Sequence, residues 1–229
     1  MNKILMILTS HSDMLDTDAK TGVWLGEFTD PYYEFTDAGY EVVLASPAGG
    51  RPPVDEMSTM TEHITGANRR FNDDAETQLK FDTTKKLSEI STDDFAGVFI
   101  PGGHGPIWDL AEDEDCGKII LEFDESEKII GAVCHGSAAF NSAVKQHPDF
   151  LQGKRMTCFS NREEALTGKE KNMPYLLEDL LKAHGAKIEN GPIPFAVNVT
   201  TNDNIITGQN PLSAGPAAKL MIEMLQSRA

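Results

Sequence analysis

Cysteine is scarce in this chain. The three cysteines, Cys116, Cys134 and Cys158, are an odd number and show no paired spacing. Small proteins that depend on disulfides carry dense, evenly numbered cysteines, so this count argues against a disulfide framework and favours a reducing compartment. The six histidines show no close pairing with one another or with cysteine at the spacing of a structural zinc site. We therefore expect no resident metal and no cofactor.

Long hydrophobic runs and excess positive charge are also lacking. The run Ile4-Leu-Met-Ile-Leu8 is too short for a secretory signal or a membrane helix, and no other run approaches the ~18 residues that a membrane span needs. Lys and Arg number 20 against 36 Asp and Glu, a net charge of −16. This charge makes nucleic acid or an anionic membrane an unsuitable partner. We expect a cytoplasmic protein.

The apolar stretches that are present alternate between strand-like and helix-like patterns. With 229 residues, 40% of them hydrophobic, and no repeat or linker, residues 1–229 are expected to form one α/β domain. Strands alternating with helices predict a mostly parallel sheet with helices on both faces. The expected strands are residues 3–9, 41–45, 95–100, 128–133 and 155–159, with shorter ones near 187–189, 195–200 and 204–207; the clearest helices are 31–38, capped by Asp30-Pro31, and 117–124, 174–184 and 213–226.

The segment 131–136, Gly-Ala-Val-Cys-His-Gly, is the centre of the functional hypothesis. It follows an apolar strand and precedes a helix-like stretch, and it places small residues two positions before and after Cys134. Small-x-nucleophile-x-small is the pattern of a nucleophile elbow, a sharp strand-to-helix turn that aims the nucleophile out of the sheet. A helix N-terminus favours the reactive thiolate, which predicts a low-pKa, exposed cysteine that is also open to oxidation and redox sensing. The alternative is a buried, inert cysteine, which is how we interpret Cys116 and Cys158.

A second motif, Pro101-Gly-Gly-His-Gly105, follows another strand. It matches neither the P-loop nor the Gly-x-Gly-x-x-Gly pattern, which argues against nucleotide binding. Glycines allow backbone N–H groups to face a site, and two such groups form an oxyanion hole. We assign the N–H groups of Gly103 and His135 to that role; a tight structural turn is the alternative. His104 leaves open a transient metal site.

Three carboxylates are candidates for partners of the cysteine and histidine. His135 needs a carboxylate or carbonyl to fix its tautomer, and Glu163 and Glu164 follow the next predicted strand. Glu27 lies among the apolar residues 23–28, where burial would raise its pKa and keep it protonated as a hydrogen-bond donor to a thiolate. The alternatives are solvated glutamates at 163 and 164 and a helix that turns Glu27 to water.

These motifs together resemble the ThiJ/PfpI superfamily, which is related to class I glutamine amidotransferases. The residues that carry the resemblance are the elbow, the glycine loop and Glu27. Residues 21–35, 103–109 and 206–211 are similar to the branch that contains glyoxalase III enzymes and heat-inducible holding chaperones. The resemblance covers nearly the whole chain. It implies a flavodoxin-like sandwich, usually a homodimer, without a clear counterpart to the extra metal-site residues of some larger relatives.

The resemblance also implies roles for individual residues. Cys134 would be the nucleophile, His135 its partner, Glu27 bonded to the sulfur, and Glu164 the acidic third member, with Glu163 as the alternative. The leading functional hypothesis is a cofactor-independent glyoxalase that converts 2-oxoaldehydes to 2-hydroxy acids. The rivals are a holding chaperone that binds unfolded proteins through residues 52–71, which include Met57, Met60 and Ile64, and a deglycase, amidase or peptidase.

Overall fold

A seven-stranded sheet forms the centre of the computed structural model, which describes residues 2–15 and 17–228. The strand order is β3-β2-β1-β4-β5-β9-β8, and every neighbouring pair is parallel except β8 and β9, which form an antiparallel hairpin. The sheet confirms the predicted flavodoxin-like α/β class. Its strands are β1 (Lys3–Ile7), β2 (Glu41–Ser46), β3 (Lys85–Lys86), β4 (Gly97–Ile100), β5 (Ile129–Val133), β8 (Val199–Asn202) and β9 (Ile205–Gly208).

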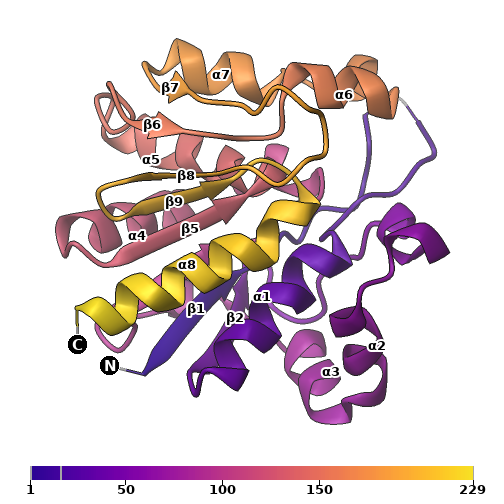
Figure 1. Cartoon of the computed structure of the whole chain (residues 1–229), viewed down its shortest axis with the longest axis vertical. Coiled ribbons are helices and arrows are strands. Elements are labelled where there is room, and N and C mark those ends of the chain that lie inside the picture. Colours follow the sequence, from indigo (N-terminus) through magenta and orange to yellow (C-terminus); the bar gives the residue numbers. More distant parts are fainter. Residues whose placement is uncertain (1, 16, 229) are drawn as a thin grey trace.

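Helices cover both faces of this sheet, as Figure 1 shows. Successive side chains of a strand point to opposite faces. In β1, Ile4 and Met6 accordingly belong to the core beneath α1 (Leu25–Asp37) and α8 (Ala214–Ser227), whereas Leu5 and Ile7 belong to the core beneath α4 (Glu114–Glu125) and α5 (Phe140–Gln146). A strand buried on both faces needs a continuous apolar run, and the sequence of β1 has one.

The remaining elements lie around the carboxyl ends and one margin of the sheet. Two short helices, α2 (Gly66–Asp73) and α3 (Ala75–Asp82), lie between β2 and β3. The others are β6 (Arg155–Met156), α6 (Asn161–Thr167), α7 (Leu177–Ala183) and β7 (Lys187–Ile188). In the part of the chain that the structure describes, no helix has the length and apolar character needed to cross a membrane.

Two predicted elements differ from those observed. The helix expected to start at Asp30 starts at Leu25, because Leu25, Phe28 and their neighbours bury an apolar face; Pro31 therefore lies inside α1. The strand expected at 155–159 is only β6, which pairs with β7 in a separate two-stranded sheet. The place beside β9 is taken by β8, and the Thr157 N–H instead donates to the Thr207 hydroxyl at 2.8 Å.

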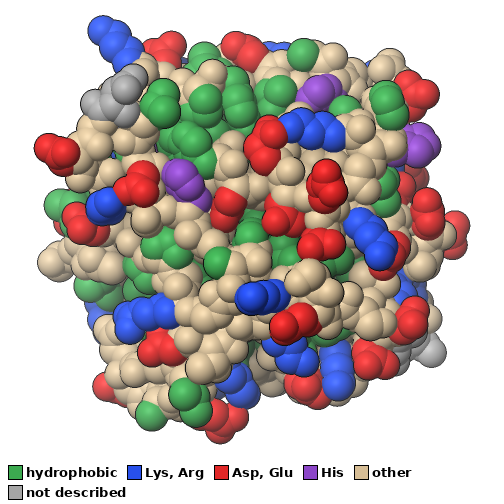
Figure 2. Space-filling model, turned by 180° about the vertical axis from the view of Figure 1, so that it is seen from behind, with side chains coloured by type: hydrophobic (Ala, Val, Ile, Leu, Met, Phe, Trp, Pro, Cys, Tyr) green, Lys and Arg blue, Asp and Glu red, His purple; other side chains and the backbone are tan. Residues whose placement is uncertain are grey.

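Acidic side chains are spread over the surface. On the face shown in Figure 2 they are dispersed among Lys and Arg side chains and small apolar areas. Surface carboxylates distributed in this way repel one another weakly through solvent. A separate set of carboxyl groups, those of Glu27, Glu163 and Glu164, is buried.

Candidate active site

The chain turns sharply at Cys134, directly after β5. Cys134 has a φ of 55°, a left-handed conformation that is unusual for a residue with a Cβ, and it begins the 3₁₀ helix Cys134–Ala139 that leads into α5. Gly136 is required because a Cβ there would lie 2.3 Å from the carbonyl oxygen of Ile100, at the end of β4. Left-handed backbone in non-glycine residues concentrates at functional sites. The sequence pattern small-x-Cys-x-small thus has the turn geometry that it predicts.

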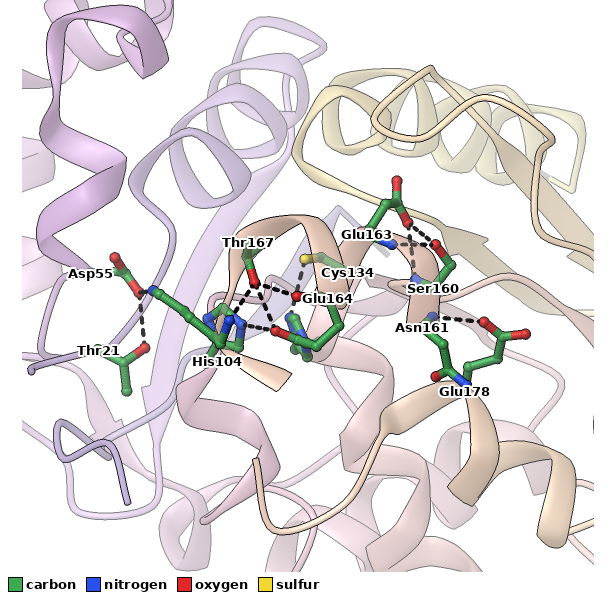
Figure 3. A network of polar contacts seen from close by, with 12 residues as sticks. Thr21, Asp55, His104, Cys134, Ser160, Asn161, Glu163, Glu164, Thr167 and Glu178 are labelled. Carbon is green, nitrogen blue, oxygen red and sulfur yellow. Dashed lines mark hydrogen bonds and ion pairs between the residues drawn. The ribbon is translucent and has the colours of Figure 1, made fainter. Parts of the chain in front are cut away.

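Cys134, His135 and Glu164 form a continuous chain of contacts. Figure 3 shows the first and last members, Cys134 and Glu164, close together. The Cys134 Sγ lies 3.4 Å from the His135 Nδ1, and the His135 Nε2 lies 2.6 Å from the Glu164 Oε2. The ionised Glu164 carboxylate can only accept a hydrogen bond, so the His135 proton lies on Nε2. The Nδ1 atom is then free to accept the thiol proton. A thiol, an imidazole base and an orienting carboxylate in this order can perform nucleophilic catalysis.

The two adjacent glutamates face different surroundings. Figure 3 shows Glu164 beside His104 and Cys134, and Glu163 beside Ser160. Both lie in the first turn of α6, where one residue advances the side chain by about 100° around the helix axis. Glu163 closes a capping box with Ser160, so it does not contact His135. The geometry thus brings Glu164 to His135, the arrangement favoured by the resemblance.

Glu27 is fully buried in the first turn of α1 and does not face water. Its Oε2 accepts the Gly102 N–H at 2.7 Å, while its Oε1 makes no hydrogen bond of ordinary geometry among the described residues. Burial raises the pKa of Glu27 to about 8, against the opposing influence of the Gly102 N–H and the nearby Cys134 thiol. Glu27 is therefore a neutral carboxylic acid at pH 7, next to the sulfur and with a proton to donate.

The expectation of an exposed, low-pKa Cys134 is wrong. Its side chain is buried, with 4% of the residue exposed. Burial raises the pKa of the Cys134 thiol well above its usual value, and negative charge on Glu27 would raise it further; the His135 backbone N–H opposes this shift. Resting Cys134 is thus a protonated thiol. A thiolate forms here only if another group takes the thiol proton, and the His135 Nδ1 is in contact with the sulfur.

His104 is the residue whose place in the site the sequence pattern did not reveal. Its Nε2 lies 2.9 Å from the Glu164 Oε1, so one carboxylate holds two imidazoles. Burial and positive charge on His135 lower the pKa of His104 to about 4, which keeps His104 neutral. Burial would raise the pKa of Glu164, but charge on His135 and hydrogen bonds from both imidazoles outweigh burial and hold the pKa well below its usual value.

The same three residues are the candidate metal ligands among the described residues. One ligand atom each from His104, His135 and Glu164 lie within 4.8 Å of one another. Two imidazoles and a carboxylate could bind a divalent transition metal if it replaced the bridging protons. An ion there would displace the Nε2 protons that both imidazoles donate to Glu164, and the contacts of 2.9 and 2.6 Å are those of hydrogen bonds.

Backbone groups close the site from the side of β4. Gly103 has a φ of 88°, and a Cβ there would lie 2.0 Å from the Gly22 carbonyl oxygen, so only glycine fits between these loops. A Cβ on the preceding Gly102 would lie 2.8 Å from the His135 backbone nitrogen. The loop and the elbow are thus in close approach, as the predicted oxyanion pair of Gly103 and His135 requires. Cys116 and Cys158, expected to be structural, are both buried.

Comparisons with known proteins find relatives over nearly the whole chain. The chain is 31% identical to the glutathione-independent glyoxalase HSP31 of Saccharomyces cerevisiae, over 98% of both proteins. The crystal structure of glyoxalase III from Candida albicans has a TM-score of 0.87 at 28% identity, covering 96% of both chains. The Rapid Encystment Protein 24 KDa of Francisella tularensis has a TM-score of 0.92 at 32% identity, covering 98% of this chain and 99% of that one. The sequence profile of the DJ-1/PfpI family matches residues 19–224, and the chain therefore belongs to this family.

Proposed function

We propose that this protein is a cofactor-independent glyoxalase that converts methylglyoxal and related 2-oxoaldehydes to 2-hydroxy acids. The observation that carries the proposal is the chain of contacts from the Cys134 Sγ through His135 to Glu164, with protonated Glu27 on the other side of the sulfur. Full-length relatives named glutathione-independent glyoxalases support the same activity. The assignment of these four residues to catalysis is part of the proposal.

The first step is attack of the Cys134 sulfur on the aldehyde carbon of the substrate. The S–C bond forms as the thiol proton moves to the His135 Nδ1, which the Glu164 carboxylate stabilises as an imidazolium. The aldehyde oxygen becomes an oxyanion facing the N–H groups of Gly103 and His135. Protonated Glu27 adds no negative charge beside the sulfur, and this neutrality makes transient thiolate less costly.

The second step is an internal redox shift that needs no external oxidant. After the oxyanion is protonated, His135 removes the proton from the former aldehyde carbon, giving an enediolate, and a proton is returned to the neighbouring carbon. The first carbon is thereby oxidised to a thioester and the second reduced to an alcohol. Water then cleaves the S–C bond, releasing the 2-hydroxy acid and regenerating the thiol. Overall, one 2-oxoaldehyde and one water give one 2-hydroxy acid.

The test is methylglyoxal consumption by purified protein free of glutathione and metal, with chiral detection of lactate. We expect Cys134→Ala to lower turnover at least about a thousandfold, as loss of a nucleophile does in other enzymes. Cys116→Ala is the matched control, because Cys116 is also buried but belongs to α4, where it faces Ser142 of α5, away from the site. Lactate formation at the wild-type rate by folded Cys134→Ala would overturn the mechanism.

A holding chaperone is the second candidate, favoured by the exposed side chains of Met57 and Met60. Unfolded chains bind exposed apolar surface, so suppression of client aggregation should persist in Cys134→Ala and be lost when both methionines are replaced by serine. A hydrolase would share the first step, but it would form no lactate from free methylglyoxal. The homodimer implied by the resemblance stays a prediction.

A further inference from the structure

Two phenylalanine rings extend outward from the His135 imidazole. The Phe159 ring lies 4.5 Å from the His135 ring, centroid to centroid, and the Phe195 ring lies 6.0 Å from Phe159. Both separations fall in the range of favourable aromatic pairs. Phe159 is buried, whereas 38% of Phe195 is exposed. Phe195 is therefore the ring of this row that a molecule entering from solvent can touch.

The backbone of Phe195 is held in an unusual conformation. Its φ is 61°, in the left-handed region that disfavours residues with a Cβ, and its N–H donates to the Glu163 Oε1 at 2.7 Å. A residue keeps such a conformation only where its surroundings enforce it. The neighbouring Ile193 and Val197 are more than half exposed, so packing of these two side chains does not enforce it.

Glu163 has more hydrogen bonds than a helix cap requires. Its Oε2 also accepts the backbone N–H and hydroxyl of Ser160 and the Gln209 amide, and its Oε1 also accepts the Asn210 amide, at 2.7–2.9 Å. All these donors are neutral, and Glu163 is fully buried. This one carboxylate joins the start of α6, the end of β9 and the segment that carries Phe195. It can thus fix Phe195 relative to Glu164, the next residue in the chain.

We propose that Phe195, positioned by Glu163, selects the side chain of the substrate and favours aromatic 2-oxoaldehydes over methylglyoxal. This inference rests on the proposed function. In the proposed mechanism the aldehyde carbon is bonded to the Cys134 sulfur, and the neighbouring carbon lies within reach of His135. The substrate side chain is attached to that second carbon and therefore extends past the His135 ring. Of the two rings in the row that begins at His135, Phe195 is the one exposed enough to meet that side chain. A phenyl group can pair with that row, and a methyl group reaches little of it.

The test is the ratio of kcat/KM for phenylglyoxal to kcat/KM for methylglyoxal, measured on wild-type protein and variants. Loss of one apolar contact in a specificity pocket is commonly worth at least about tenfold, so we expect Phe195→Ala to lower the ratio about tenfold. Phe195→Gly should do the same while relieving the left-handed backbone, which separates loss of the ring from misfolding. Phe195→Tyr, which keeps the ring, should retain most of the wild-type ratio.

Two further variants test the role of Glu163. Glu163→Gln keeps the shape but replaces an acceptor oxygen with an amide that faces donors, so the ratio should fall in the direction of Phe195→Ala. Ile193→Ala is the control on the same segment and should leave the ratio unchanged. A folded Phe195→Gly protein with the wild-type ratio would overturn the inference and leave the glyoxalase proposal intact. Wild-type protein that converts neither compound would overturn both.

Discussion

At the scale of single residues, the site is a set of buried ionisable groups with different protonation states. Glu27 is neutral because burial raises its pKa to about 8, whereas Glu164 is charged because two imidazoles hold it. His104 is neutral because burial and His135 oppose its charge. Groups whose surroundings separate their pKa values in this way divide acid and base roles between them.

His104 provides the residue-scale prediction. His104 makes no hydrogen bond to the Cys134 sulfur, but it shares the Glu164 carboxylate with His135. We therefore expect His104 to act as a positioning residue. His104→Phe should lower kcat about tenfold or more, since a hydrogen bond to a charged group is worth about 1.5–3 kcal/mol. His104→Gln can still donate to Glu164 and should recover part of the loss. Steady-state kinetics beside thermal unfolding checks this; unchanged kcat in folded His104→Phe would contradict it.

The sequence predicted the candidate site to the level of residue types but not of environments. Cys134 and Glu27 were identified because a small-x-Cys-x-small turn and a carboxylate inside an apolar run are local patterns. Burial of the Cys134 thiol depends on loops that are distant in sequence, so its pKa direction was predicted wrongly. The choice between Glu163 and Glu164 depends on where α6 begins, and element boundaries are the least predictable feature of a sequence.

At the scale of elements, the site depends on how closely the elbow approaches the end of β4. Gly136 passes against the carbonyl oxygens of Ile100 and Pro101, both of which a Cβ would meet at less than 3 Å. Backbone atoms cannot move aside as a side-chain tip can. The loop after β4 also carries His104 and Gly103. Any displacement of the elbow would therefore shift the nucleophile and the groups that face it together.

We predict that Gly136→Ala destabilises the protein by about 2–3 kcal/mol, the upper part of the range for overpacked interiors, and lowers turnover as well. Gly66→Ala is the matched control, because a Cβ at this first residue of α2 would meet nothing within 4 Å. Alanine in a helix is favoured over glycine by roughly 0.5–1 kcal/mol, so this control should be neutral or stabilising. Urea unfolding of both variants measures the difference; equal stabilities would show that the elbow tolerates a side chain.

Helices and strands were predicted correctly where neighbouring residues determine them. The predictions were less accurate where contacts between distant parts of the chain determine where an element begins or what it pairs with. The four central parallel strands were found because strands buried on both faces need unbroken apolar runs. The start of α1 was missed because Asp30-Pro31 is a good local start signal, and burial of the residues before it overrides that signal. Residues 155–159 have strand character, but only Arg155 and Met156 pair, and they pair with β7 instead of joining the main sheet.

At the scale of the whole molecule, the surface charges and the buried groups of the candidate site affect the free energy of unfolding in different ways. Salt screens the repulsion between surface carboxylates, whereas the contribution of the buried groups to stability changes mainly with their protonation. Below pH 6.5 the unfolded chain gains a proton at His104 that the folded chain resists, which lowers stability as the pH falls. Glu27 acts in the opposite sense, and its influence extends to higher pH because its folded-state pKa is about 8.

The Glu27 carboxyl group should give the protein a measurable pH dependence of stability. Between pH 4.5 and 8 the folded chain keeps the Glu27 proton that the unfolded chain releases, so Glu27 stabilises the fold at low pH and loses this contribution as the pH rises through 8. The free energy of unfolding of wild type relative to Glu27→Gln should therefore fall by about 1.4 kcal/mol per pH unit between about pH 5.5 and 7, and less steeply as the pH approaches 8. Glutamine can still accept the Gly102 N–H but cannot titrate. Urea unfolding at several pH values, with exposed Glu62→Gln as control, measures this slope. Parallel curves for wild type and Glu27→Gln would mean that Glu27 is already charged, and the neutral donor beside the sulfur would have to be abandoned.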